Sequence, residues 1–270
     1  MHHISVGQVH GQAVEVIRKN YGKILIAILV IMGIGFGVSM VSGLVSFPFI
    51  FGSTFEIMPL IQGLDMSSLD GILQYYGIIF QKFLPFYIGV MAFSILLSAA
   101  LEPLQGGRRL YILNLAYGQK PKVEQMFKTY RRFWKFVGCY FWVWLWTFLW
   151  SLLLIVPGII KSLSYSMTPY LVAQYENLTV REAMDLSKRI TEGYKGQIFL
   201  MYLIIFGYSL VVSVTSMIFC LGSIVALAYP LLWLMPITFT LEATMYNSIK
   251  QAAFAKGVMS AEDLRIELNN

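Results

Sequence analysis

Charged residues are scarce in this sequence. Asp, Glu, Lys and Arg make up 13% of its 270 residues, whereas about a quarter of the residues are charged in ordinary soluble domains. Apolar residues make up 57%, and a soluble chain of this length could not bury that much apolar surface. The composition therefore excludes an ordinary soluble domain and indicates a membrane protein.

Residues that usually bind metals or carry catalysis are also few. The histidines are His2, His3 and His10, and no cluster of carboxylates or thiols accompanies them, so we expect no metal site and no cofactor. Cys139 and Cys220 fall near opposite faces of the expected membrane protein, too far apart for a disulfide. Neither H-E-x-x-H nor G-x-S-x-G is present, and we therefore expect no enzymatic activity.

Long apolar blocks are what the sequence has instead. A helix needs about 20 apolar residues to cross a hydrocarbon core, and six blocks reach or approach that length. They are residues 24–46, 85–101, 136–156, 159–175, 198–217 and 224–246. Membrane strands would alternate polar with apolar residues, whereas these blocks are continuous. We predict an all-α fold: a polytopic bundle of six transmembrane helices in a single membrane domain, 1–270.

The basic residues are distributed unevenly between the connections. Eighteen of the 20 Lys and Arg lie before the first block, in the connections 102–135 and 176–197, and in the C-terminal tail. Lys82 and Lys161 fall on the other side. Because basic residues near span ends stay in the cytoplasm, we expect a multi-pass plasma-membrane protein with both termini cytoplasmic. The net charge of +6 then indicates anionic lipid headgroups as partners, and no nucleic acid.

Three basic segments have the periodicity of amphipathic helices. They lie at about 5–20, 122–135 and 179–192, each directly before an outward-going block. We predict three interfacial helices on the cytoplasmic side, each followed by a helical hairpin. Thr179 and Glu182 form a capping box at the start of the third. The outer segment 47–84 is apolar and aromatic, and we expect it to rest on the membrane surface or to cap the bundle.

The third and fourth blocks are separated by two residues that disfavour helix continuation. Pro157 and Gly158 predict a tight outer turn there. The fourth block, 159–175, carries seven hydroxyl side chains. We expect this helix in the interior of the bundle, where hydroxyl groups find partners.

Polar residues within the apolar blocks or near their ends are the candidate functional positions. They are Glu102, Lys161, Tyr165, Thr168, Tyr170, Ser187 and Glu242. Two interpretations of the two glutamates stay open. They line a cytoplasm-facing pocket, paired with each other or with Arg108 or Arg109, or they are solvated or salt-bridged at headgroup level. Lys161 lies about one turn from the predicted outer surface, where its ammonium group would reach water.

The third block is rich in tryptophan. Its tryptophans are Trp142, Trp144, Trp146 and Trp150. An aromatic cage for a ligand is one interpretation. Bulky packing with lipid contact is the simpler one, although tryptophan is more common at the membrane interfaces than at mid-depth.

Two stretches resemble a known family. "LLLIVPGIIKSLSYSMTPYL" and "LTVREAMDLSKRITEGYKGQIFLMYL" are similar to uncharacterised bacterial integral membrane proteins, the domain of unknown function nine-seven-five. The likeness runs from 103 to 249. Its pattern falls on Pro157, Gly158, Tyr165, Tyr170, Ala183, Ser187, Gly193, Lys195, Phe199, Ala243 and Tyr246. The family tends to have tryptophan where this chain has Tyr208. The resemblance implies six membrane helices, a distant similarity to the membrane portion of some glycerophosphodiester phosphodiesterases, and no established activity.

Two functional hypotheses follow from these features. The first is a non-enzymatic accessory, assembly or immunity-type membrane module, with a protein partner or a second copy of the chain as its target. The alternative is a transporter or lipid-handling protein with a cavity beside the fourth block, favoured by the hydroxyl groups there and by Glu242. An intramembrane hydrolase is the least favoured, because no nucleophile and base can be paired.

Overall fold

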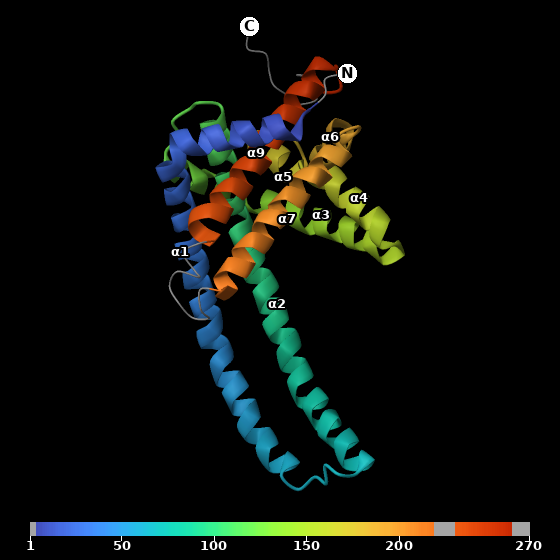
Figure 1. The fold of residues 1–270 in the computed structure, drawn as a ribbon. Coiled ribbons are helices and arrows are strands. Elements are labelled where there is room, and N and C mark those ends of the chain that lie inside the picture. Colours follow the sequence, from blue (N-terminus) through green and yellow to red (C-terminus); the bar gives the residue numbers. More distant parts are fainter. Residues whose placement is uncertain (1–3, 219–229, 261–270) are drawn as a thin grey trace. The chain divides into compact units, whose positions relative to one another are not determined.

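A computed structural model describes residues 4–218 and 230–260. In this part of the chain every regular element is a helix and no strand is present (Figure 1). The prediction of an all-α fold is therefore confirmed. The chain divides into two compact units: residues Met32–Leu101 form one, and Met1–Ile31 with Glu102–Asn270 form the other.

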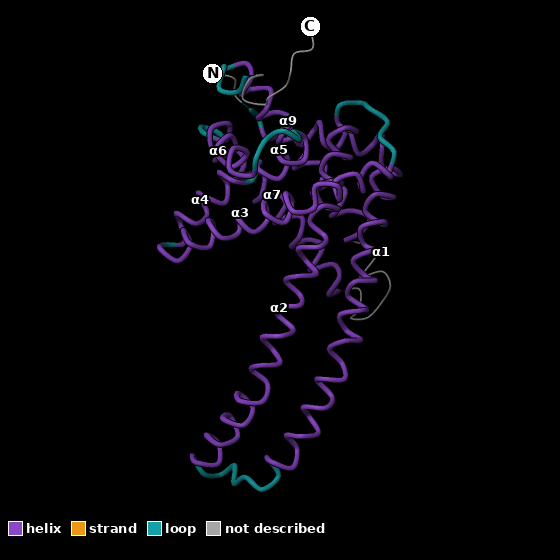
Figure 2. The backbone as a smooth tube through the Cα atoms, turned by 180° about the vertical axis from the view of Figure 1, so that it is seen from behind, coloured by secondary structure: helices purple, strands orange, loops and turns teal. Residues whose placement is uncertain are grey.

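The smaller unit consists of parts of two long helices. It contains the C-terminal part of helix α1 (Val6–Ile61) and the N-terminal part of helix α2 (Leu69–Ala116). Residues 62–68 join the two helices (Figure 2). Asp65 organises this loop, since its Oδ1 atom accepts hydrogen bonds from the backbone and the hydroxyl group of Ser67. The predicted outer segment 47–84 spans the end of α1, this loop and the start of α2. It continues the two helices, because its turn-forming residues are confined to the loop.

The first helix of the larger unit bends near its start. Asn20 has non-helical backbone angles inside α1 (φ −130°, ψ 18°). This kink separates the predicted interfacial segment 5–20 from the predicted span 24–46. Before the kink Val9 and Ala13 are buried, and after it Ile24 and Ile28 are.

A short 3-10 helix, η1 (Val123–Arg132), occupies most of the segment predicted as the second interfacial helix. It packs closely on α2, since a Cβ atom at Gly107 would overlap the backbone carbonyl group of Met126. The hydroxyl group of Thr129 donates to the carbonyl oxygen of Pro103 at 2.6 Å. Helix α3 (Phe133–Leu153) follows directly.

Helices α3 and α4 (Ile155–Tyr165) form a tight hairpin (Figure 1). The reversal takes place at Leu154, which is extended (φ −162°, ψ 147°). The predicted turn at Pro157 and Gly158 is therefore three residues too late: both lie inside α4. Proline is tolerated in the first turn of a helix because its missing N–H needs no partner there. Gly158 lets the hairpin close, since a Cβ atom would lie 2.9 Å from Cα of Ser151.

The predicted fourth span, 159–175, is interrupted. Helix α4 ends at Tyr165, and helix α5 (Thr168–Gln174) begins after a two-residue break, with a proline in its first turn. The 11 residues of α4 reach about 16 Å at 1.5 Å per residue. That is about half of a hydrocarbon core of about 30 Å.

The remaining helices complete the larger unit. They are α6 (Val180–Thr191), α7 (Lys195–Ile218), the π-helix η2 (Pro230–Leu234) and α9 (Met235–Ala255). The capping box predicted at Thr179 and Glu182 is present, and Gly193 follows α6 with φ 80°. The predicted fifth span, 198–217, lies within α7. Residues 224–229 of the predicted sixth span lie outside the described residues.

Four helical stretches in the described part of the chain are long and apolar enough to cross a membrane. They are Val6–Leu44, Leu69–Ala116, Val123–Leu153 and Lys195–Thr215. Large apolar side chains on them are exposed; Leu44 and Leu69 are each 72% accessible. Such surfaces fit contact with lipid, as expected for a membrane protein.

The close contact at Gly158 gives a stability test. Gly158→Ala is expected to destabilise the protein by about 1–3 kcal/mol, because the new methyl group would overlap the backbone of Ser151. Gly207→Ala is the matched control: it lies in a helix with no atom within 4 Å of the new Cβ, and alanine favours helix by about 1 kcal/mol. Thermal unfolding in detergent measures both. Equal midpoints for the two variants would contradict the proposed packing.

Candidate functional site

A groove lies between α3, α4 and α6. Its volume is about 560 Å³, in the range of ligand pockets. We call it the α4 groove and define it by its lining residues, Trp142, Trp146, Trp150, Lys161, Tyr165, Val180, Arg181, Met184, Asp185 and Lys188. Two of the seven candidate residues, Lys161 and Tyr165, are among them.

Helical spacing explains how each wall of the α4 groove forms. Trp142, Trp146 and Trp150 recur every four residues and therefore share one face of α3. Arg181, Asp185 and Lys188 are spaced by four and by three residues and therefore share one face of α6. Their spacing was visible in the sequence, but the contact between α6 and the α3–α4 hairpin was not.

Cations lie against the aromatic rings of the α4 groove. The Nζ atom of Lys161 is 4.6 Å from the ring centroid of Trp150, and the Nζ atom of Lys188 is 5.5 Å from that of Tyr165. Lys188 also forms an ion pair with Asp185 at 2.8 Å. Three cations face one carboxylate, so the groove is positively charged. The aromatic faces add attraction for the cations within about 6 Å.

A second cluster surrounds a buried arginine. Arg108 on α2 is 5% exposed, and its guanidinium carbon lies 3.4 Å from the ring centroid of Phe239 on α9. Its Nε atom donates to Gln105 at 2.9 Å. Among the described residues no acceptor meets its Nη1 atom. Burial of a charged group requires neighbouring charges or dipoles, and two of the candidate residues supply them.

Those residues are the two glutamates. Glu102 lies 4.0 Å from Arg109 (Oε2 to Nη1), and both side chains are about one-fifth exposed. Glu242 lies within electrostatic range of Arg108. Of the interpretations left open by the sequence, an ion pair with an arginine is thus present for Glu102, whereas Glu242 forms no salt bridge with any described residue. Gln105 and Phe239 were missed, since neither spacing nor charge distinguishes them in the sequence.

The candidate residues of α5 lie in the core. Thr168 and Tyr170 are buried, and the ring of Tyr170 stacks on Tyr246 with centroids 4.9 Å apart. The hydroxyl group of Tyr246 donates to Oε1 of Gln174 at 2.7 Å. The interior position expected for the fourth block thus holds for α5.

Ser187 supports the break between α4 and α5. It is fully buried on α6, and its hydroxyl group donates to the carbonyl oxygen of Ser164 at 2.7 Å. Thr191, one turn later, lies 3.4 Å from the same oxygen. These contacts satisfy a carbonyl group near the end of α4, where the helical hydrogen bonds stop. The role of Ser187 is therefore to hold α6 against the interrupted helix.

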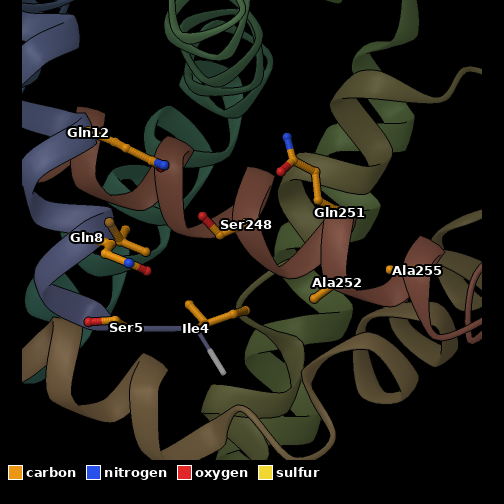
Figure 3. Close-up of a pocket in the computed structure, with 9 residues that line it drawn as sticks. Ile4, Ser5, Gln8, Gln12, Ser248, Gln251, Ala252 and Ala255 are labelled. Carbon is orange, nitrogen blue, oxygen red and sulfur yellow. The ribbon is translucent and has the colours of Figure 1, made fainter. Parts of the chain in front are cut away.

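A polar notch lies between the start of α1 and the end of α9. Its volume is about 350 Å³. In Figure 3 the side chains of Gln8 and Gln12 come from α1, and that of Ser248 comes from α9 on the opposite wall. Nearby, His10 and the hydroxyl group of Tyr208 are hydrogen-bonded at 2.8 Å. The notch carries hydrogen-bonding groups without a formal charge, unlike the α4 groove.

The comparisons with known proteins give one match. Residues 152–253 match the model of a family described as a protein of unknown function, DUF975. The resemblance predicted from the sequence is confirmed for that segment. No curated protein and no solved structure matches the chain, so the likeness to the phosphodiesterase membrane portion stays a prediction. The DUF975 segment contains every candidate residue except Glu102. It supplies the α4 and α6 walls of the groove, whereas the tryptophans lie before it.

Lys250 provides a pH test of the region around α5. Its ammonium group donates to the hydroxyl group of Tyr117 and to Oε1 of Gln174, and burial lowers its pKa from 10.5 to about 8. Between these values the folded protein binds fewer protons than the unfolded chain. This group therefore makes the free energy of unfolding rise as the pH rises from about 8 to 10.5.

The measurement compares wild type with Lys250→Met across that pH window. The difference in unfolding midpoint, wild type minus Lys250→Met, is expected to increase as the pH rises. The difference between the two proteins isolates Lys250 from the neighbouring tyrosines. A constant difference over the window would show that the pKa of Lys250 is not lowered.

Proposed function

We propose that this chain is a non-enzymatic protein of the bacterial plasma membrane that binds a membrane lipid in the α4 groove. The observation that carries the proposal is a positively charged groove whose other wall is three tryptophans on one helical face. Tryptophan and lysine together are typical of the headgroup region of a membrane. The accessory, assembly or immunity-type role expected from the sequence stays a prediction, as does a protein partner or a second copy.

The charges of α6 indicate the position of the groove across the membrane. This helix carries Arg181, Asp185 and Lys188 on one face, and charged residues of that density belong at a water interface. Trp150 lines the groove with them and precedes the hairpin turn at Leu154 by four residues, about 6 Å along the helix. The turn therefore lies only a short way beyond the headgroup region occupied by α6.

This geometry favours a hairpin that enters the membrane and returns. Six complete crossings would carry the turn to the outer surface, with Lys161 close to it. Lys161 lines the same groove as α6, which favours the side of the membrane that holds α6. The exposed apolar turn, in which Leu154 is 68% and Ile155 77% accessible, suits immersion in lipid. We propose cytoplasmic termini with a re-entrant α3–α4 hairpin.

Cysteine labelling tests the re-entrant hairpin. In a chain without its native cysteines, Leu154→Cys is expected to resist a membrane-impermeant maleimide added outside intact cells, since the turn is immersed in lipid. Met66→Cys in the loop between α1 and α2 is the positive control and should be labelled. Labelling of both positions from outside would establish a full crossing and overturn the re-entrant arrangement.

Lipid retention tests the groove itself. Trp146→Ala is expected to lower the amount of lipid that stays bound through detergent purification by about fivefold, the equivalent of about 1 kcal/mol for one aromatic contact. Trp144→Ala is the matched control on the same helix, because Trp144 lies outside the groove and stacks on Phe148. Native mass spectrometry counts the bound lipid. Equal loss in both variants, or no bound lipid in the wild type, would contradict the proposal.

A further inference from the structure

The charges of the α4 groove discriminate between kinds of headgroup. Asp185 is neutralised by Lys188, whose Nζ atom lies 2.8 Å from its Oδ1 atom. Lys161 and Arg181 form no salt bridge with any described residue. Two cations are thus left without a carboxylate, and both line the same space. A ligand with one negative charge placed in this space would be attracted by both cations.

The aromatic rings do not favour a choline headgroup. Quaternary ammonium groups bind in cages of free aromatic faces. Here Lys161 lies over Trp150, and Lys188 lies near the ring of Tyr165. These ammonium groups lie against two of the four aromatic rings that line the groove, and their charge would repel a ligand cation placed at the other two.

The apolar residues that line the groove suit the glycerol backbone and acyl chains of a lipid. Val180 and Met184 on α6 and the rings of Trp142 and Trp146 on α3 border the same groove as the cations. A charged headgroup against Lys161 and Arg181 would therefore continue into an apolar surface along α3. Free phosphate would use the cations and leave this surface unused.

We propose that the α4 groove selects a lipid with an anionic phosphodiester headgroup, such as phosphatidylglycerol, through Lys161 and Arg181. This inference rests on the proposed lipid binding and adds the headgroup class. It assigns Lys161 and Arg181 to the phosphate, Lys188 to holding Asp185, and the tryptophans to the glycerol backbone and the start of the acyl chains.

The test is a competition on the full-length chain. Wild type is incubated in detergent with equimolar phosphatidylglycerol and phosphatidylcholine, and native mass spectrometry measures the ratio of the two bound lipids. The wild type is expected to retain phosphatidylglycerol in preference. The double variant Lys161→Gln/Arg181→Gln is expected to lose about tenfold or more of that preference, because each cation near a headgroup contributes separately.

The matched control removes the same charge elsewhere. Lys120→Gln/Lys122→Gln changes two exposed lysines in the connection between α2 and η1, and its lipid ratio should equal that of the wild type. Wild type that binds both lipids equally, or a double variant that keeps the preference, would overturn the headgroup assignment while leaving lipid binding intact. Absence of any bound lipid would instead remove the proposed function.

Competition with soluble anions distinguishes a lipid headgroup from free phosphate as the ligand of the groove. Inorganic phosphate and glycerol 3-phosphate, added at increasing concentration, should leave bound phosphatidylglycerol in place at a moderate ionic strength matched with chloride. Displacement by either anion beyond the chloride control would show that the groove takes a free phosphate, and would overturn the lipid assignment.

Discussion

The position of α6 across the α3–α4 hairpin is the constraint on which the rest of the groove depends. Two buried hydroxyl groups, those of Ser187 and Thr191, meet the carbonyl oxygen of Ser164 at the end of α4. In a low-dielectric interior an unpaired carbonyl group is costly, so these contacts tie a polar helix to an apolar hairpin. The break in α4–α5 is what makes that carbonyl available. An uninterrupted fourth helix would satisfy it internally and leave α6 without this anchor.

The buried side chain of Arg108 is also a polar group in a low-dielectric interior, but other kinds of contact stabilise it. Arg108 faces the ring of Phe239 and the side chain of Gln105, and Glu242 lies within electrostatic reach. Such a cluster contributes little net stability, since desolvation opposes the attraction, but removal of one member leaves an uncompensated buried charge. It therefore specifies how α2 meets α9 more than it strengthens the fold. The α4 groove differs because its charges remain partly exposed and two of its cations lack a carboxylate.

The sequence predicted the local features well and the tertiary ones poorly. Helices, the capping box at Thr179, and the glycine after α6 follow from short-range rules of periodicity and backbone geometry. The hairpin turn was misplaced by three residues, because Pro157 is compatible with a first helical turn. The expected position of Lys161 near the outer surface rests on hydropathy alone, which counts residues along the chain and does not register that α6 packs against α4. Contacts between distant segments carry no periodic signal.

In the proposed re-entrant arrangement, the charge asymmetry and the lipid binding have one structural cause. If Lys161 lies at the depth of α6, it joins the cytoplasmic set of basic residues, and Lys82 alone remains on the other side. The cytoplasmic side then holds one basic residue more than it would with six complete crossings. The tryptophans of α3 likewise move from mid-membrane, where they are uncommon, to the interface, where they are favoured. A re-entrant hairpin thus places both residue types where membrane physics prefers them, and their shared surface is the α4 groove.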